Sequence, residues 1–364
     1  MHISPTLSVY IGRNFLFWIA VVLSGLLITV LLFDTIELLR RAAGRPAATF
    51  EVVVTMALLR LPELAQQLMP FVLLFATMLT FWRLTRSHEL TVVRAAGVSV
   101  WQFLFPAVTL ALVVGAVTIA VLNPIAAAFY LRFEQDEARF LRGRPSLLAV
   151  SPTGFWLRQA DGATNQVIHA LRVSSQDMEL YDVIILNFEN PDRFVGRIDA
   201  GLARLEEGYW LVRDAWLSGP DRAPRFERSL NLLTEMTRER IHDSFASPET
   251  ISFWDLPGFI AILDRAGFSA LRHRLHFQSL LAVPLLLAAM VLVAATFSLR
   301  PPRLGGAGAL LISGIGAGFA LFFLTKLVGA LGQNGTIPVV LAAWAPTAVF
   351  TMLGVTMLLH LEDG

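Results

Sequence analysis

Cysteine is absent from this 364-residue chain, and charged side chains make up only 16% of it. The lack of cysteine excludes disulfide bonds, cysteine-ligated zinc and iron–sulfur clusters. Soluble domains are about 25% charged, so the low charge argues against an ordinary soluble protein. The net charge of +1 provides no broad positive field, and we therefore expect no nucleic-acid partner.

Motifs for enzyme chemistry are missing as well. The sequence contains no G-x-x-x-x-G-K-[ST] loop for ATP, no H-E-x-x-H metal motif and no G-x-S-x-G nucleophile motif. His273 and His276 stand three residues apart, but Arg272 and Arg274 surround them and no carboxylate is near. Basic residues at a membrane interface explain this group better than a metal site does. We expect no catalytic residue, no metal and no cofactor.

Long apolar runs are what the chain does contain. Apolar residues make up 55% of it and the mean hydropathy is +0.62, which indicates a membrane protein. A helix of roughly 20 apolar residues crosses a hydrocarbon core about 30 Å thick. Six runs serve as spans, and they cover residues 15–33, 52–82, 98–123, 276–299, 309–330 and 337–361. We expect kinks at Pro62 and Pro70, and a stop of the third span at Asn123 and Pro124 before a helical extension into water.

Residues 146–244 have a different character. Short alternating segments rich in β-branched and aromatic residues are separated by turn signals such as Glu207-Gly208 and Gly219-Pro220. This spacing predicts a small β-sandwich or jelly roll. The fold class is therefore a membrane protein of six transmembrane helices with an inserted all-β, jelly-roll-like domain. Its expected parts are residues 1–124 with the first three spans, 125–270 with the β domain and its connecting helices, and 271–364 with the last three spans.

A charged island, RLTRSHELTVVRAAG, separates the second span from the third and runs from Arg83 to Gly97. Ser87 suits an N-cap, and Gly97 stands where the residue that closes a helix belongs. Leu90, Val93 and Gly97 would share one side of a short helix. One interpretation is an ordinary positively charged loop. The other is a coupling helix that docks into a nucleotide-binding partner, and spacing alone does not choose between them.

Basic residues lie at both ends of the spans. A cytoplasmic N-terminus would place the arginines of the short loops inside, as membrane proteins tend to do, and the β domain outside. Arg40, Arg41 and Arg132 would remain at the outer rim, which an anionic ligand would explain. Arg40 and Arg41 are either stop-transfer charges or bidentate phosphate ligands. Lys326 lies within the fifth span, so we expect it to face a cavity or to reach for the interface.

Three features resemble the LptF/LptG permeases of the lipopolysaccharide export ABC transporter. The loop SHELTVVRAAGVSVWQF at residues 87–103 is similar to the family's coupling segment, with an acid, an Arg-Ala pair and a glycine in that order. The second feature is the order of three spans, a β insert and three spans. The third is the tail at residues 298–347, whose proline-arginine turn, G-x-G-x-G-F run and G-x-I-P sequence are closer to LptG than to LptF.

The resemblance implies a permease subunit of the bacterial inner membrane, multi-pass and with a periplasmic domain. It would extract lipopolysaccharide and pass it on, driven by ATP hydrolysis in a partner. The implied partners are an LptF-like paralogous permease, a homodimeric cytoplasmic LptB-like ATPase, an LptC/LptA-like periplasmic bridge and the lipopolysaccharide itself. One alternative is a membrane protein that transmits force from an ATPase to a periplasmic partner without moving lipid. An intramembrane enzyme is the other, but no facing catalytic pair is evident.

The resemblance also assigns roles to residues. Arg40 and Arg41 match basic residues at the outer end of the first span that contact the phosphates of the lipid in this family. Lys326 and Arg132 are further candidates for that contact. A helix at residues 87–97 would couple to the ATPase through Glu89, Leu90, Val93, Arg94 and Gly97. Gln278 stands where we expect a basic residue, which puts in doubt a role of the fourth span in phosphate binding.

Overall fold

The computed structural model describes residues 5–45, 47–142, 148–151, 154–161, 164–174, 179–189, 193–220, 222–234, 247–265, 269–299 and 307–363. The chain divides into two compact units. The helical unit comprises residues 1–141, 249–254 and 273–364, and the β unit comprises residues 142–248 and 255–272. The chain therefore passes from the helical unit to the β unit twice. The predicted proline-arginine turn at residues 300–303 lies outside the described residues.

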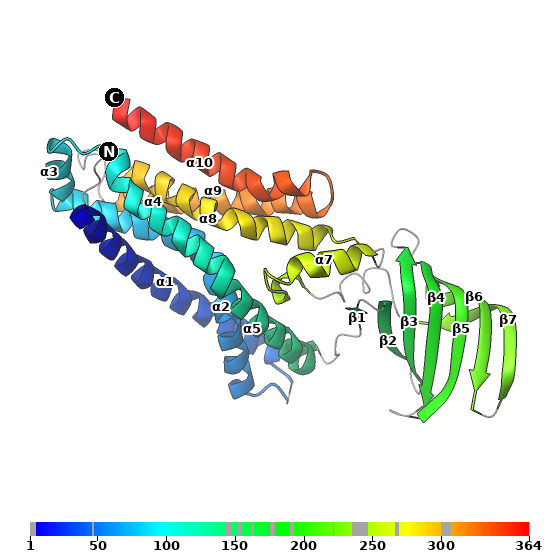
Figure 1. Cartoon of the computed structure of the whole chain (residues 1–364). Helices are drawn as coiled ribbons and strands as arrows, with labels where there is room; N and C mark the ends of the chain where they lie inside the picture. Colours follow the sequence, from blue (N-terminus) through cyan, green and yellow to red (C-terminus); the bar gives the residue numbers. More distant parts are fainter. Residues whose placement is uncertain are drawn as a thin grey trace. The chain divides into compact units, whose positions relative to one another are not determined.

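Six helical stretches among the described residues are long and apolar enough to cross a membrane, which confirms the six predicted spans. A helix satisfies its backbone groups internally, as a lipid environment requires. The stretches are α1 (Pro5–Ala42), α2 (Phe50–Arg86), α4 (Val100–Val117) with its continuation, α8 (Leu271–Ser298), α9 (Ala307–Gln333) and α10 (Val339–Asp363). Figure 1 shows them as a bundle, with the short α3 (Glu89–Ala95) at the end that also holds both termini.

The helix that contains the third span is not uniform. α4 runs into a π-helical turn, η1 (Thr118–Leu122), then into α5 (Asn123–Asp136) and a second π-helical turn, η2 (Glu137–Arg142). The predicted helical extension after Asn123 and Pro124 is confirmed, because α5 and η2 continue the helix. Pro124 lies in the first turn of α5, where a missing N–H is tolerated. Pro62 and Pro70 lie inside α2, which runs as one helix from Phe50 to Arg86.

The core of the helical unit joins α1, α2, α4 and α8. Phe15, Phe81 and Phe103 are buried in it, and the rings of Phe81 and Phe103 meet edge to face with centroids 5.7 Å apart. α4 and α8 approach closely because Gly115 has no side chain: a Cβ added there would lie 2.4 Å from Cα of Pro284. α1 and α9 instead have only 11% and 17% of their most apolar windows buried, so most of their surface is left for lipid or another protein.

Among the described residues, the β unit contains one seven-stranded antiparallel sheet whose strands follow one another in chain order. The strands are β1 (Leu148–Ser151), β2 (Gly154–Asp161), β3 (Thr164–Ser174), β4 (Glu179–Glu189), β5 (Arg193–Glu206), β6 (Tyr209–Gly219) and β7 (Arg222–Leu233). Figure 1 shows β2 to β7 side by side in one curved sheet. The inserted β domain is confirmed. The jelly-roll arrangement is not, because the described strands form one meander and not two facing sheets.

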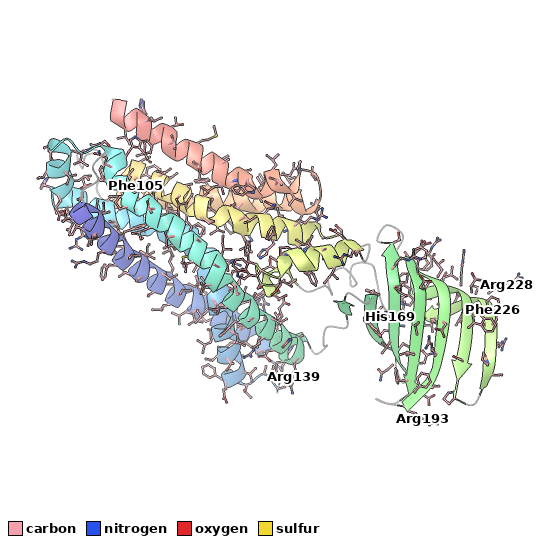
Figure 2. The ribbon with its side chains drawn as sticks, viewed as in Figure 1. Phe105, Arg139, His169, Arg193, Phe226 and Arg228 are labelled. Atoms are coloured by element: carbon pink, nitrogen blue, oxygen red, sulfur yellow. The ribbon has the colours of Figure 1, made fainter. Side chains whose placement is uncertain are left out.

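One face of this sheet is buried. Ile168, Ile185 and Ile198 are cross-strand neighbours on it, and Trp210 is fully buried nearby. α7 (Leu256–Arg265), which follows the 3-10 turn η3 (Pro248–Thr250), adds Leu263 to the same core. Figure 2 shows that Phe226 belongs to the last strand, and its side chain is 44% exposed. The sheet thus has one apolar face packed in a core and another face that is more accessible.

Glu179, at the start of β4, accepts hydrogen bonds from two residues of the sheet. The hydroxyl of Tyr181 donates to its Oε2 (2.6 Å), and Nε of Arg204 on β5 donates to its Oε1 (2.8 Å). These hydrogen bonds, that of Tyr181 first, lower the pKa of Glu179 below its usual range. A carboxyl whose pKa is lower in the folded chain stabilises the fold above its unfolded pKa, and the contribution is lost as the pH falls through the folded pKa.

We predict that Gly115→Ala destabilises the full-length protein in detergent by about 1–3 kcal/mol, because the added methyl group pushes α4 away from α8. The melting temperature of the purified protein measures this loss. Gly25→Ala on α1 is the control, since a Cβ there meets nothing within 4 Å. Equal melting of the two variants would mean that the approach of α4 to α8 does not limit stability.

We also predict that Glu179→Gln weakens the sheet at pH 7 and that its difference from the wild type shrinks below the unfolded pKa of glutamate, about 4.3. Hydrogen exchange of β4 and β5 in the full-length protein, corrected for intrinsic exchange at each pH, measures the effect. Glu189→Gln, at the exposed end of β4, serves as the control. A difference from the wild type that stays constant from pH 7 to pH 3 would contradict an ionic origin.

Candidate functional site

α3 joins α2 to α4, and its start differs from the prediction. Ser87 does not cap α3 but ends α2. Its hydroxyl donates to Oε1 of Glu89 (2.9 Å). The residue before α3 is His88, whose backbone is left-handed with φ 59°. The chain therefore reverses sharply between α2 and α3, and a local hydrogen bond, not an N-cap, holds the carboxylate of Glu89.

The end of α3 is as predicted. Gly97 has φ 82°, a conformation that glycine adopts without strain. The N–H of Gly97 bonds to the carbonyl of Arg94 (3.0 Å), and the N–H of Val98 bonds to the carbonyl of Val93 (3.3 Å). These two bonds form a Schellman motif, which closes the helix and satisfies its last carbonyls.

The two faces of α3 have different surroundings. Leu90 is 7% exposed and belongs to the core of the helical unit. Glu89, on the same side, accepts a hydrogen bond from the hydroxyl of Tyr10 on α1 (2.9 Å). Val92 is 69% exposed, and Arg94 is exposed as well. Val92 was not among the predicted coupling residues, because it lies outside the apolar stripe of Leu90, Val93 and Gly97, of which Leu90 packs inward. An apolar residue outside this stripe, such as Val92, is the sequence feature that indicates an outward contact.

A second cluster lies at the other end of α1, thirty residues or roughly 45 Å of helix away from Tyr10. Arg40 donates from Nε and Nη2 to the two oxygens of Glu37, each at 2.8 Å. Arg41 bonds to Glu37 Oε1 (2.9 Å) and reaches Glu137 of η2 (3.3 Å). The side chains of Arg40 and Arg41 remain 74% and 52% exposed. Two exposed guanidinium groups thus share one carboxylate, and both can be reached from outside.

Beside this cluster, polar residues of α2 are buried or half-buried. Arg60 pairs with Asp34 of α1 and lies over the ring of Phe133 on α5, 5.4 Å from its centroid. Glu63 is 8% exposed and accepts a hydrogen bond from the amide of Gln67. The contacts between helices could not be predicted from the sequence, because two residues that pair across helices stand at no characteristic distance from each other in the chain. They fasten α1, α2 and α5 to one another.

The remaining predicted lipid contacts are exposed. Arg132 lies on α5 and has no acidic partner among the described residues. Lys326 is exposed on α9 with its Nζ 5.8 Å from the ring centroid of Phe322. Figure 2 shows Arg139 at the far end of the extended third span. Gln278 accepts a hydrogen bond from the indole of Trp344 on α10 (3.1 Å), so it joins two helices.

His273 is 5% exposed near the start of α8. Within the described residues, no group of three or more histidine or acidic side chains could hold a metal ion. The described residues place a partly exposed helix, α3, beside the start of α1 and two exposed guanidinium groups near its end.

Comparison with known proteins gives one family. The sequence model of "Lipopolysaccharide export system permease LptF/LptG" matches residues 9–360. The lipopolysaccharide export system permease protein LptG of Escherichia coli strain K12 is 26% identical over 309 residues, covering 83% of this chain and 84% of the relative. LptG of Haemophilus influenzae is 22% identical over 359 residues, covering 96% of each.

Proposed function

The chain belongs to the lipopolysaccharide export system permease LptF/LptG family, and from this premise we propose how its two sites serve export. It is a permease subunit, and ATP hydrolysis lies in a partner. The observation that carries the function is the family match over nearly the whole chain, joined to a multi-pass helical unit with an inserted β unit. In this proposal the protein lies in the bacterial inner membrane, extracts lipopolysaccharide and passes it toward a periplasmic bridge.

The proposed complex has four kinds of subunit. An LptF-like permease pairs with this chain, and a homodimeric LptB-like ATPase binds both permeases from the cytoplasm. An LptC/LptA-like protein receives the lipid on the periplasmic side. The exposed apolar faces of α1 and α9 support a permease partner, because such faces suit lipid or another membrane helix. The domains keep the predicted roles: residues 1–124 and 271–364 span the membrane, and residues 125–270 carry the periplasmic part.

We assign ATPase docking to the exposed face of α3. Val92 and Arg94 supply an apolar contact and a charge there. Glu89 and Leu90 act from the other side: the bond from Tyr10 and the packing of Leu90 fix the angle of α3 against α1. Gly97 closes the helix. The coupling role that we predicted for Leu90 is therefore one of positioning, and the contact itself passes to Val92.

We assign recognition of lipid phosphates to Arg40 and Arg41, with Arg132 and Lys326 as additional cationic contacts. Guanidinium groups bind phosphate with two parallel hydrogen bonds. In the free chain Glu37 occupies donors of both arginines. A phosphate group carries more negative charge than this carboxylate and would replace it as the acceptor. Glu37 would hold the two arginines in place when no lipid is bound.

For docking, we predict that Val92→Asp abolishes co-purification of the ATPase, because it buries an unpaired charge in the contact, at a cost of about 2 kcal/mol or more. Val92→Thr, of nearly the same size and without charge, should retain most of it. Leu90→Ala should instead lower thermal stability by about 2–5 kcal/mol through the cavity it leaves. Wild-type yields of ATPase with Val92→Asp would place the docking contact elsewhere.

For lipid capture, we predict that Arg41→Ala lowers the rate of lipopolysaccharide release from proteoliposomes about tenfold, the effect of losing about 1.4 kcal/mol. Arg41→Lys should restore part of it, since lysine keeps the charge but not the planar fork. Arg41→Glu should be the weakest variant. Glu37→Gln should change release in the opposite direction or leave it unchanged, because it frees both arginines.

Arg40→Ala and Lys326→Ala complete this series, with lipid-stimulated ATP hydrolysis as the second measurement. Equal release by every variant, from complexes with unchanged composition, would show that these charges serve only to set the topology of the chain in the membrane.

A further inference from the structure

The junction between α4 and α5 binds a short segment, Phe253 and Trp254, that belongs to neither of the proposed sites. Asn123 is 3% exposed and makes two hydrogen bonds. Its Nδ2 donates to Oε1 of Gln66 on α2 (3.3 Å), and its Oδ1 accepts the backbone N–H of Phe253 (2.7 Å). The indole N–H of Trp254 donates to the backbone carbonyl of Ala120 (3.3 Å). We name Asn123, Phe253 and Trp254 the clasp.

The chemistry of the helix break explains why the clasp forms at this point. In an α-helix the carbonyl of Ala120 would accept from the N–H four residues later. That residue is Pro124, which has no N–H. Around it the helix takes the π form, η1, a local widening that is frequent at functional sites. Pro124 thus leaves an acceptor on the third span for a donor from outside the helix, and Trp254 supplies that donor.

The clasp lies at the point where the chain passes from the helical unit to the β unit. Phe253 and Trp254 are the last residues of the segment 249–254, which belongs to the helical unit, and residues 255–272 belong to the β unit. Within the β unit, Leu263 and Ala270 are part of the core of the sheet. Phe253 also stacks on Phe277 of α8, with centroids 5.3 Å apart and rings 16° from parallel. The third span and α8 therefore hold the chain immediately before it enters the β unit, and α2 bonds to Asn123 of the third span.

We propose that the clasp transmits movements of the spans to the β unit during transport, so that Asn123 and Trp254 are positioning residues for lipid transfer. This inference rests on the function proposed above. A π-helical turn contains one residue more than an α-helical turn and can revert, which moves the helix beyond it. A shift between α4 and α5 would pull directly on Phe253 and Trp254. Without the clasp, ATP hydrolysis would continue but would deliver less lipid.

The test compares conservative variants in the full complex in proteoliposomes. Trp254→Phe removes the indole donor and keeps a ring, and Asn123→Leu removes both amide bonds at similar volume. Trp344→Phe is the matched control, since it removes the indole bond from Trp344 to Gln278 (3.1 Å) elsewhere in the helical unit. ATP hydrolysis and release of lipopolysaccharide to a soluble acceptor are measured together, and their ratio is the readout.

We expect Trp254→Phe to lower release per ATP about fivefold, the effect of one hydrogen bond, and Asn123→Leu to lower it further. Hydrolysis itself should change less than about twofold, and Trp344→Phe should leave the ratio unchanged. Pro124→Ala supplies an N–H for the carbonyl of Ala120. Because a carbonyl oxygen can accept two hydrogen bonds, this N–H competes with the indole of Trp254 without excluding it. Pro124→Ala should therefore lower release no more than Trp254→Phe does. The double variant should add little to Trp254→Phe alone, because both changes act on the same bond.

Two results would overturn the proposal. One is a parallel fall of hydrolysis and release in the clasp variants, and the other is an equal fall in Trp344→Phe. If the wild type releases no lipopolysaccharide, the proposed function fails, and hydrogen exchange then tests the clasp alone. A non-hydrolysable ATP analogue should alter exchange of residues 118–123 and 249–254 together in the wild type but not in Asn123→Leu. Independent changes in the two segments would overturn the clasp.

Discussion

Hydrocarbon offers no hydrogen-bond partner to a peptide group, and the architecture of the helical unit follows from this constraint. Each of the six long stretches satisfies its own backbone and leaves apolar side chains for the lipid. Polar side chains within the stretches are admitted where another helix supplies a partner. Arg60 of α2 pairs with Asp34 of α1, and Asn123 of α5 pairs with Gln66 of α2. Such pairs fix which helices lie beside one another, because an apolar surface alone is satisfied equally well by lipid.

The same constraint shapes the functional sites, because charges must gather where helices leave the membrane. α1 has 38 residues, roughly 57 Å of helix, against a hydrocarbon core of about 30 Å. It therefore reaches both sites. Tyr10 near its start bonds to Glu89 of α3, and Arg40 and Arg41 lie in its last turn. In our account one stiff helix connects the proposed ATPase contact with the proposed lipid contact. A movement imposed on α3 by the ATPase can then reach the arginines without an intermediate joint.

Much of this fold could be predicted from the sequence, since the signals are long and local. Six apolar runs, a β-rich insert and a glycine at the end of α3 each depend on residues that are close in the chain. The failures depend on contacts between distant residues. Ser87 does not cap α3. Its hydroxyl donates to the carboxylate of Glu89, which also accepts a hydrogen bond from Tyr10 of α1. The π-helical turn before Pro124 was not predicted either, and there the carbonyl of Ala120 accepts a hydrogen bond from Trp254, far along the chain.

Candidate residues for the site could be chosen from the sequence, whereas their orientation could not. A short helix was predicted within the charged island at residues 83–97, and α3 lies there. Periodicity alone, however, cannot distinguish the inward stripe from the outward face of a seven-residue helix. The structure separates them, because Leu90 is buried and Val92 is not. Likewise Arg40 and Arg41 were visible as charges at the end of a span, whereas their shared partner Glu37 and the link to Glu137 required the folded chain.

In the proposed function this chain carries lipopolysaccharide, whereas in the alternative it only transmits force from the ATPase to a periplasmic partner. The most direct measurement is the amount of lipopolysaccharide bound to the complex purified from membranes, determined by mass spectrometry before and after ATP is added with a soluble acceptor. Our account predicts lipid bound in a fixed ratio to the complex and its transfer to the acceptor only when ATP is hydrolysed. A complex that contains the ATPase and hydrolyses ATP, yet holds no lipopolysaccharide at any stage, would contradict it.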